Sequence, residues 1–124
     1  MINLSVSRSL RTVSGLVLCF ALSGVAIAHV FPRTQVPGAG ASVAPPPEVR
    51  IVFDGPLEPA FSSLTVTDAS GKQVNTAKSA VDAQDHNAIS LALPALQSGR
   101  YTVHWVAVAS DGHRTHGNYS FEVK

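Results

Sequence analysis

Three residues have the types and the placement to chelate a metal ion: His29, Asp111 and His113. His29 directly follows Ala26-Ile27-Ala28, the small-residue pattern after which a signal peptidase cuts. Cleavage there would make His29 the first residue, with an α-amine and an imidazole that together close a ring on one ion. Asp111 and His113 lie two positions apart, and such side chains share one face of an extended chain. This segment could therefore add a carboxylate and a second imidazole.

The donor set predicts copper in its oxidised form. An amine and two imidazoles can take three positions in one plane, and Cu(II) both prefers tetragonal nitrogen and oxygen ligands and binds them most tightly among the divalent ions. Met1 and Cys19 are the only sulfur-containing residues, and both lie before the cleavage point. The mature chain would therefore lack the soft ligands that favour Cu(I). Because amine and imidazole bind metal only when unprotonated, affinity should rise with pH.

Other interpretations of these residues stay open at this point. Asp111-Gly112 before a last strand is also an ordinary hairpin turn, in which His113 would be a solvated loop residue. His116 could be an extra ligand, a partner of a ligand, or an exposed residue at the start of that strand. His104 and His86 are interpreted as surface histidines.

Residues 1–28 are interpreted as a signal peptide. A basic start at Arg8 and Arg11 precedes an apolar stretch from Val13 to Ile27. A transmembrane helix needs roughly 20 apolar residues, and this stretch is shorter and interrupted by serine and glycine. An uncleaved membrane anchor is the alternative. Removing 28 of the 124 residues leaves 96, which is enough for one small domain over residues 29–124.

The charge balance excludes several classes of partner. The chain has nine lysines and arginines against eight aspartates and glutamates. Arg8 and Arg11 leave with the signal peptide while every acid stays, so the formal charge of +1 becomes −1. Because no run of basic residues remains, we expect neither nucleic acid nor an anionic membrane surface as a partner. We expect the mature chain to be a monomer that is not embedded in a membrane.

The elements that must position the three candidate ligands are short strands. Apolar residues recur at every second position, which is typical of strands with one buried face. The residues expected to face the core are Val49, Ile51 and Phe53; Leu64 and Val66; Ile89, Leu91 and Leu93; Tyr101, Val103, Trp105 and Ala107; and Tyr119, Phe121 and Val123. Residues 76–87 are polar and could form a loose strand or a loop. About seven strands in a chain of this size predict an all-β fold, an immunoglobulin-like antiparallel β-sandwich without its disulfide.

Several segments of the mature chain occur together in one known family. They are the N-terminal histidine, residues 52–62 (VFDGPLEPAFS), residues 99–105 (GRYTVHW), residues 110–113 (SDGH) and residues 117–121 (GNYSF). In their order and spacing they resemble the CopC family of periplasmic copper-resistance proteins, over nearly all of the mature chain.

The resemblance implies a periplasmic protein in which His29, Asp111 and His113 hold Cu(II). Many members also have a methionine-rich loop that binds Cu(I), and residues 29–124 contain no methionine. The chain is therefore similar to the members that bind only Cu(II). Some members place a glutamate close to the copper, where this sequence has Gly55. The fourth or axial position would then be taken by water, Asp54 or His116, although Asp54 also suits the end of a strand.

Three functions compete on these grounds. The first, which we favour, is a binding protein that captures, buffers or delivers Cu(II), with an inner-membrane copper transporter of the CopD type as the partner that the resemblance implies. The second is a copper-dependent oxidative enzyme of the lytic polysaccharide monooxygenase kind, which uses a similar amine and two-histidine site. The third is an adhesion or structural sandwich without a metal, because one fold hosts many functions. We expect a protein that is not an enzyme.

Overall fold

The computed structural model describes residues 29–124, so the segment interpreted as a signal peptide lies outside the described residues. All regular structure in this range is strand: β1 (Pro32–Val36), β2 (Ser42–Val43), β3 (Glu48–Phe53), β4 (Ser63–Thr67), β5 (Ala80–Val81), β6 (Ala88–Ala92), β7 (Gly99–Val108) and β8 (Arg114–Val123). Within residues 29–124 there is no helix long and apolar enough to cross a bilayer.

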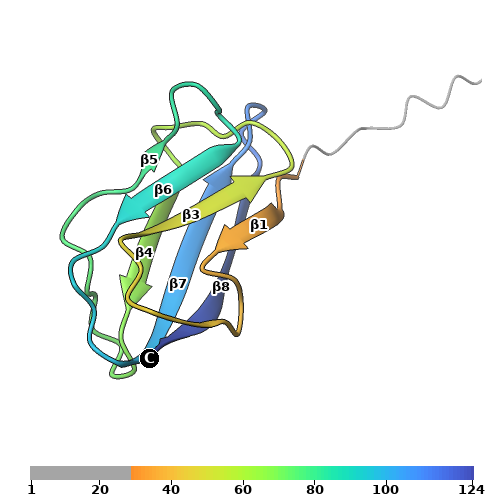
Figure 1. The fold of residues 1–124 in the computed structure, drawn as a ribbon. Helices are drawn as coiled ribbons and strands as arrows, with labels where there is room; N and C mark the ends of the chain where they lie inside the picture. Colours follow the sequence, from red (N-terminus) through yellow and green to blue (C-terminus); the bar gives the residue numbers. More distant parts are fainter. Residues whose placement is uncertain (1–28) are drawn as a thin grey trace, which may run out of the picture.

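The strands form two four-stranded sheets that pack face to face (Figure 1). One sheet has the order β1-β3-β6-β5 and the other the order β2-β8-β7-β4. Neighbouring strands are antiparallel, except that the two-residue β2 runs parallel to β8. The prediction of an all-β sandwich is therefore confirmed, with eight strands where about seven were expected.

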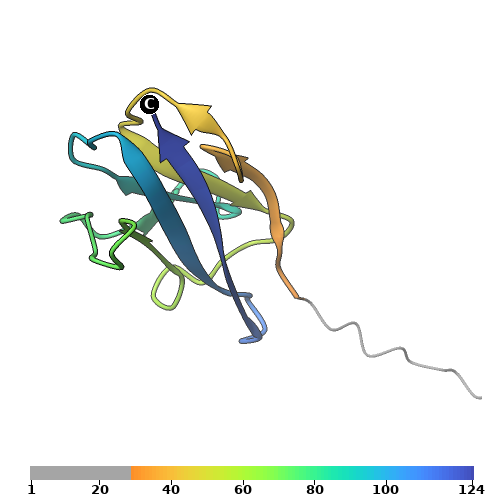
Figure 2. The ribbon, with the colours of Figure 1, turned by 90° about the horizontal axis from the view of Figure 1, so that it is seen from below.

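The longest pairing is the hairpin of β7 and β8, which joins ten successive residue pairs from Gly99 with Val123 to Val108 with Arg114. The turn of this hairpin and the beginning of the described chain lie at the same end of the sandwich, and the C-terminus lies at the other (Figures 1 and 2). The topology thus brings residue 29 and residues 109–113 to one end, although about 80 residues separate them in the chain.

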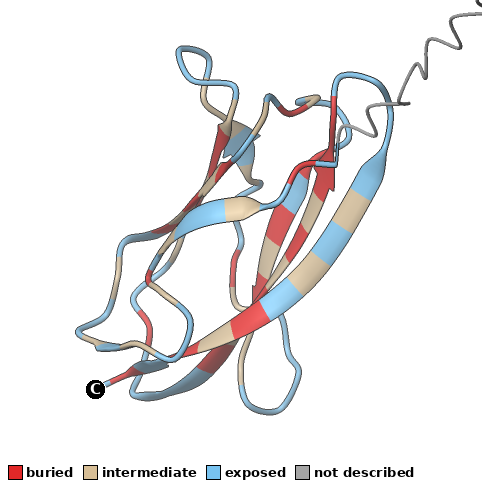
Figure 3. Ribbon diagram, turned by 90° about the vertical axis from the view of Figure 1, so that its right-hand side faces the viewer, coloured by how far each residue is buried: buried red, intermediate tan, exposed pale blue. Residues whose placement is uncertain are grey.

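The core lies between the two sheets and is built mainly from the residues that the two-residue period predicted to face inward, together with Val30, Leu57, Leu96 and Ala109 (Figure 3). Every one of them is buried except Leu93, which follows β6 and packs partly buried against the core. Phe53 and Trp105 meet across the sheets with ring centroids 5.4 Å apart in an edge-to-face arrangement. Burial of these apolar side chains, without any disulfide, is the main force that holds the domain together.

The pattern did not reveal the short outer strands. β1 and β2 have no fully buried residue, so their sequences lack the apolar alternation that marks a half-buried strand. Residues 76–87 are mostly loop, with only the two-residue β5 among them. The three prolines at 45–47 end directly before β3, as expected of residues that cannot donate a hydrogen bond into a sheet.

Gly117 is a position where the sandwich has no room for a side chain. A Cβ atom there would lie 2.6 Å from Cζ2 of Trp105, whose indole packs across β8. We expect Gly117→Ala to lower the free energy of unfolding by about 1–3 kcal/mol, because overpacking forces neighbouring groups to shift. Urea denaturation checks this, with the exposed neighbour Asn118→Ala as the control. Equal midpoints for the two variants would show that the indole moves aside freely.

Candidate metal centre

The turn between β7 and β8 brings Asp111 and His113 together. Oδ1 of Asp111 accepts a hydrogen bond from the backbone N–H of His113 at 3.0 Å. Oδ2 of the same carboxylate accepts one from Nδ1 of the His113 imidazole at 2.8 Å. Gly112 between them has a φ of 88°, in the left-handed region that favours glycine. The hairpin turn that Asp111-Gly112 allowed is therefore present, and this aspartate-stabilised turn, not extended geometry, brings the two side chains together.

The electrostatics of the turn keep the carboxylate charged. The backbone N–H of His113, and next its imidazole, hold the pKa of Asp111 below its usual range. The two side chains are substantially exposed, at 36% for Asp111 and 53% for His113. An anion and an imidazole at the surface form a site that an ion can reach from solvent.

His29 lies beside this turn. The centroid of its imidazole is 5.6 Å from that of His113, with an angle of 63° between the rings. The ring of Phe31 also lies near the His29 imidazole, with centroids 6.2 Å apart and the planes at 75°. The structure therefore brings together all three residues that the sequence singled out, from the start of the chain and from the β7–β8 turn.

The distances suit a shared ion. Imidazole nitrogens bind first-row metals at roughly 2.0–2.1 Å, which places the ring centroids of two imidazoles on one ion roughly 4.5 Å apart at neighbouring positions of a square and roughly 6.4 Å apart at opposite positions. The 5.6 Å between His29 and His113 lies between these two values. The 2.8 Å between Nδ1 of His113 and Oδ2 of Asp111 is a hydrogen bond. It is also about the separation of two neighbouring donor atoms that each lie ~2 Å from one ion in a square arrangement.

The side chains alone do not form a complete metal cage. Among residues 29–124, no three histidine, cysteine, aspartate or glutamate side chains converge closely enough to hold an ion by themselves. An ion bound here would need donors besides these side chains, and the α-amine that cleavage before His29 would create is one candidate.

The other three histidines lie on β7, on β8 and in the loop before β6. Nε2 of His104 is 3.0 Å from Oγ1 of Thr67 on the outer face of the sheet. His116 is exposed on β8, where it pairs with Val106, and His86 is exposed in the loop before β6. The interpretation of His104 and His86 as surface residues is consistent with these positions.

Asp54 directly follows β3, so the expectation that it ends a strand is consistent with the structure. Its Oδ1 accepts a hydrogen bond from the backbone N–H of Phe31 at 2.9 Å, and its own N–H donates to the carbonyl of Phe31 at 3.0 Å. Sequence reasoning missed this contact, because a side chain that bonds a backbone group 23 residues away leaves no mark on the sequence.

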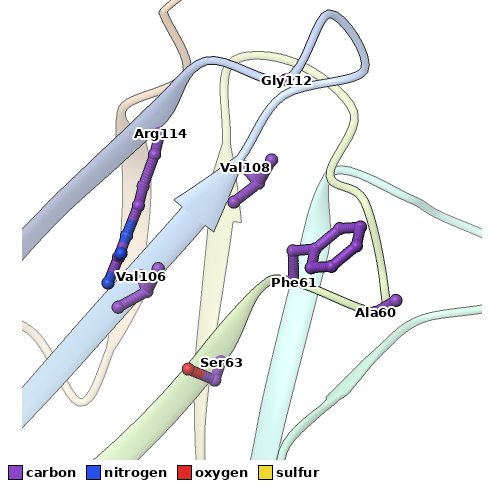
Figure 4. Close-up of a pocket in the computed structure, with 7 residues that line it drawn as sticks. All are labelled: Ala60, Phe61, Ser63, Val106, Val108, Gly112 and Arg114. Atoms are coloured by element: carbon purple, nitrogen blue, oxygen red, sulfur yellow. The ribbon is translucent and has the colours of Figure 1, made fainter.

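A shallow apolar groove borders the same turn on the outer face of the sheet (Figure 4). Phe61, Val106 and Val108 form its apolar part, and Arg114 and Gly112 lie on the side of the turn. The Phe61 side chain is 69% exposed. No histidine or carboxylate lines the groove, so it is a surface next to the candidate metal centre and not a second one.

Comparisons with known proteins point to a single family. The CopC domain family matches residues 33–124. Protein YobA of Escherichia coli K12 is 32% identical over 122 residues, covering 97% of this chain and 98% of YobA. Copper resistance protein C of Escherichia coli is 36% identical over 117 residues, covering 89% of this chain and 91% of that protein. The crystal structure of CopC from Methylosinus trichosporium OB3b superposes with a TM-score of 0.73 at 35% identity, over 77% of this chain and 94% of that one.

Proposed function

Because the chain belongs to the CopC domain family, we propose that its mature form is a periplasmic Cu(II)-binding protein that captures, buffers or delivers copper. Residues 1–28 act as the signal peptide, and residues 29–124 form the copper-binding domain. The α-amine and the imidazole of His29, the carboxylate of Asp111 and the imidazole of His113 bind one ion. The names of relatives such as copper resistance protein C support copper as the cargo.

One observation carries the choice of ligands. The imidazoles of His29 and His113 lie 5.6 Å apart, and Asp111 contacts His113 at 2.8 Å. The imidazoles of His29 and His113 and the carboxylate of Asp111 thus lie at one end of the sandwich. On cleavage, His29 would add its α-amine to this group. The nitrogen-rich set and the absence of sulfur from residues 29–124 favour Cu(II) over Cu(I).

We propose binding and not catalysis. Asp111 lies next to His113 and would occupy a coordination position that a reacting oxygen molecule needs. In the described chain, Tyr101, Trp105 and Tyr119 are buried, and Phe31 and Phe61 are the exposed aromatic residues, which leaves little of the flat aromatic face that polysaccharides require. A peroxide-dependent assay on chitin or cellulose should give no more product than free copper. The CopD-type transporter stays a prediction from the family resemblance.

Titration of the protein that begins at His29 tests the proposal directly. We expect one equivalent of Cu(II) to quench the fluorescence of Trp105, the single tryptophan, and to stay bound through dialysis. Zn(II) should bind more weakly, because Cu(II) lies above it in the affinity order for such ligands. Loss of the copper during dialysis would favour a sandwich without a metal role.

Asp111→Ala should weaken Cu(II) binding by roughly 10–100-fold, the usual cost of removing a group that orients or supplements a metal ligand. Competitive titration measures the loss. Asp68→Ala is a matched control, because Oδ1 of Asp68 accepts a hydrogen bond from the N–H of Ser70 at 2.9 Å in a similar turn, which follows β4 near the start of β7 at the other end of the sheet. The role given to Asp111 is wrong if both variants bind Cu(II) like the unmodified protein.

A further inference from the structure

We propose that Asp54 and Thr115 are positioning residues that clamp residues 30 and 31, so that His29 is held against His113 before copper arrives. They do not bind the ion. This inference rests on the proposed function and goes beyond its ligands. It explains how the first residue of a mature chain, a place where chains ordinarily fray, can serve in a precise site.

The first contact of the clamp is a pair of hydrogen bonds between Phe31 and Asp54. The N–H of Phe31 donates to Oδ1 of Asp54 at 2.9 Å, and the N–H of Asp54 donates to the carbonyl of Phe31 at 3.0 Å. The ladder between β1 and β3 is irregular at this point, since its register shifts between Pro32 and Thr34. Pro32 has no N–H to donate. The Asp54 side chain therefore supplies an acceptor where the regular ladder ends.

The second contact comes from the opposite sheet. Oγ1 of Thr115 on β8 donates to the carbonyl of Val30 at 2.7 Å. Thr115 lies two residues after His113, and Val30 is the residue after His29. β8 begins directly after His113 and, through Thr115, holds Val30, the residue next to His29. This hydrogen bond therefore links the backbone beside His113 to the backbone beside His29.

The third contact is steric. Val30 is only 4% exposed, and a Cβ atom at residue 55 would lie 2.9 Å from its Cγ1. Gly55 thus leaves the space that Val30 fills, and a side chain there would displace it. Residue 30 is fixed by burial as well as by its carbonyl, and residue 31 by both of its backbone polar groups.

The clamp should matter for affinity because a bidentate N-terminal residue must be ordered before it can meet His113. When folding has already fixed residues 30 and 31, copper binding does not bear that entropic cost. Asp54 acts here through an oxygen that accepts from a backbone N–H. The negative charge of Asp54 is not needed for this hydrogen bond. A ligand, in contrast, would act through direct contact between its charged oxygen and the copper ion.

The test uses proteins that begin at His29 and compares Cu(II) affinity by competitive titration. Asp54→Ala and Thr115→Val should each weaken binding by roughly 5–10-fold, the range expected for one lost net hydrogen bond. Their electron paramagnetic resonance spectra should show a fraction of copper that has lost one nitrogen ligand. Asp54→Asn and Thr115→Ser keep the acceptor and the donor, and should retain most of the affinity.

Matched controls come from the other end of the β4–β7 sheet. In Asp68→Ala the lost carboxylate accepts from the N–H of Ser70 at 2.9 Å, and in Thr67→Val the lost hydroxyl contacts His104 at 3.0 Å. Both should bind copper normally. Thermal unfolding of every variant separates a loss of positioning from a loss of fold, and Thr115→Val, the more conservative change, tests the clamp even if Asp54→Ala unfolds.

Each outcome separates the clamp from the function on which it rests. If the unmodified protein holds no copper, the proposed function is wrong. If it binds tightly and Asp54→Ala and Thr115→Val bind equally well with the same spectrum, the clamp is wrong. If Asp54→Asn is as weak as Asp54→Ala, the charge of Asp54 acts on the ion, which overturns the positioning role.

Discussion

Adding one alanine before His29 is expected to abolish tight copper binding. The α-amine would move onto the alanine, and the nitrogen of His29 would become an amide, which binds Cu(II) only by losing its proton. The chelate ring between amine and imidazole is then lost. We expect the dissociation constant to rise by roughly 1,000-fold, equivalent to about 4 kcal/mol of binding free energy.

Competitive titration of Cu(II) against a chelator of known affinity measures this change. The control carries the added alanine after Lys124 at the other end of the sandwich, and it should bind like the unmodified protein. The folded domain should be intact in both, because residue 29 is exposed and outside the core. Equal affinity of the two extended proteins, with the same electron paramagnetic resonance spectrum, would mean that the amine of His29 is not a ligand.

His113→Ala should have the second largest effect. It removes the imidazole that lies 5.6 Å from His29 and leaves Asp111 without its side-chain partner. The amine and imidazole of His29 would then bind copper much as a short peptide does. We expect a loss of roughly 100–1,000-fold in affinity, about 3–4 kcal/mol. The domain should unfold at nearly the same temperature, since the His113 side chain is 53% exposed.

The remaining histidines of the same sheet provide the controls for this variant. His104→Ala and His116→Ala each remove an imidazole that is not among the proposed ligands, and both should retain full affinity for Cu(II). A large loss in His116→Ala would instead make that residue a ligand. His113→Ala with unchanged affinity would remove the β7–β8 turn from the site altogether.

The core could be predicted because burial follows a simple period. Val49, Ile51 and Phe53 alternate with exposed or half-buried residues, and the same alternation marks β7 and β8. The outer strand β1 has no such signature, since its pairing with β3 rests on backbone hydrogen bonds that any sequence without too many prolines can form. A two-residue period of apolar residues predicts strands that bury one face in the core. It cannot predict strands that bury no residue.

The candidate site could be predicted only in part, for a similar reason. The types of His29, Asp111 and His113 and the small residues before His29 indicated the chemistry. The sequence allowed both a hairpin turn and an extended segment at Asp111 and His113, and the structure shows the turn. The sequence also offered Asp54 as a reserve ligand, whereas in the structure the carboxylate of Asp54 accepts a hydrogen bond from the backbone N–H of Phe31. Long-range contacts between one side chain and one backbone group have no periodicity to detect.

The electron paramagnetic resonance spectrum of the exported, N-terminally sequenced protein with one equivalent of Cu(II) tests the central claim most directly. A chain that begins with His29 should give a tetragonal spectrum with hyperfine coupling to three nitrogens. These are the α-amine of His29, the imidazole of His29 and the imidazole of His113. A chain that begins elsewhere and still gives this spectrum, or one that begins with His29 and shows fewer nitrogens, would contradict the account.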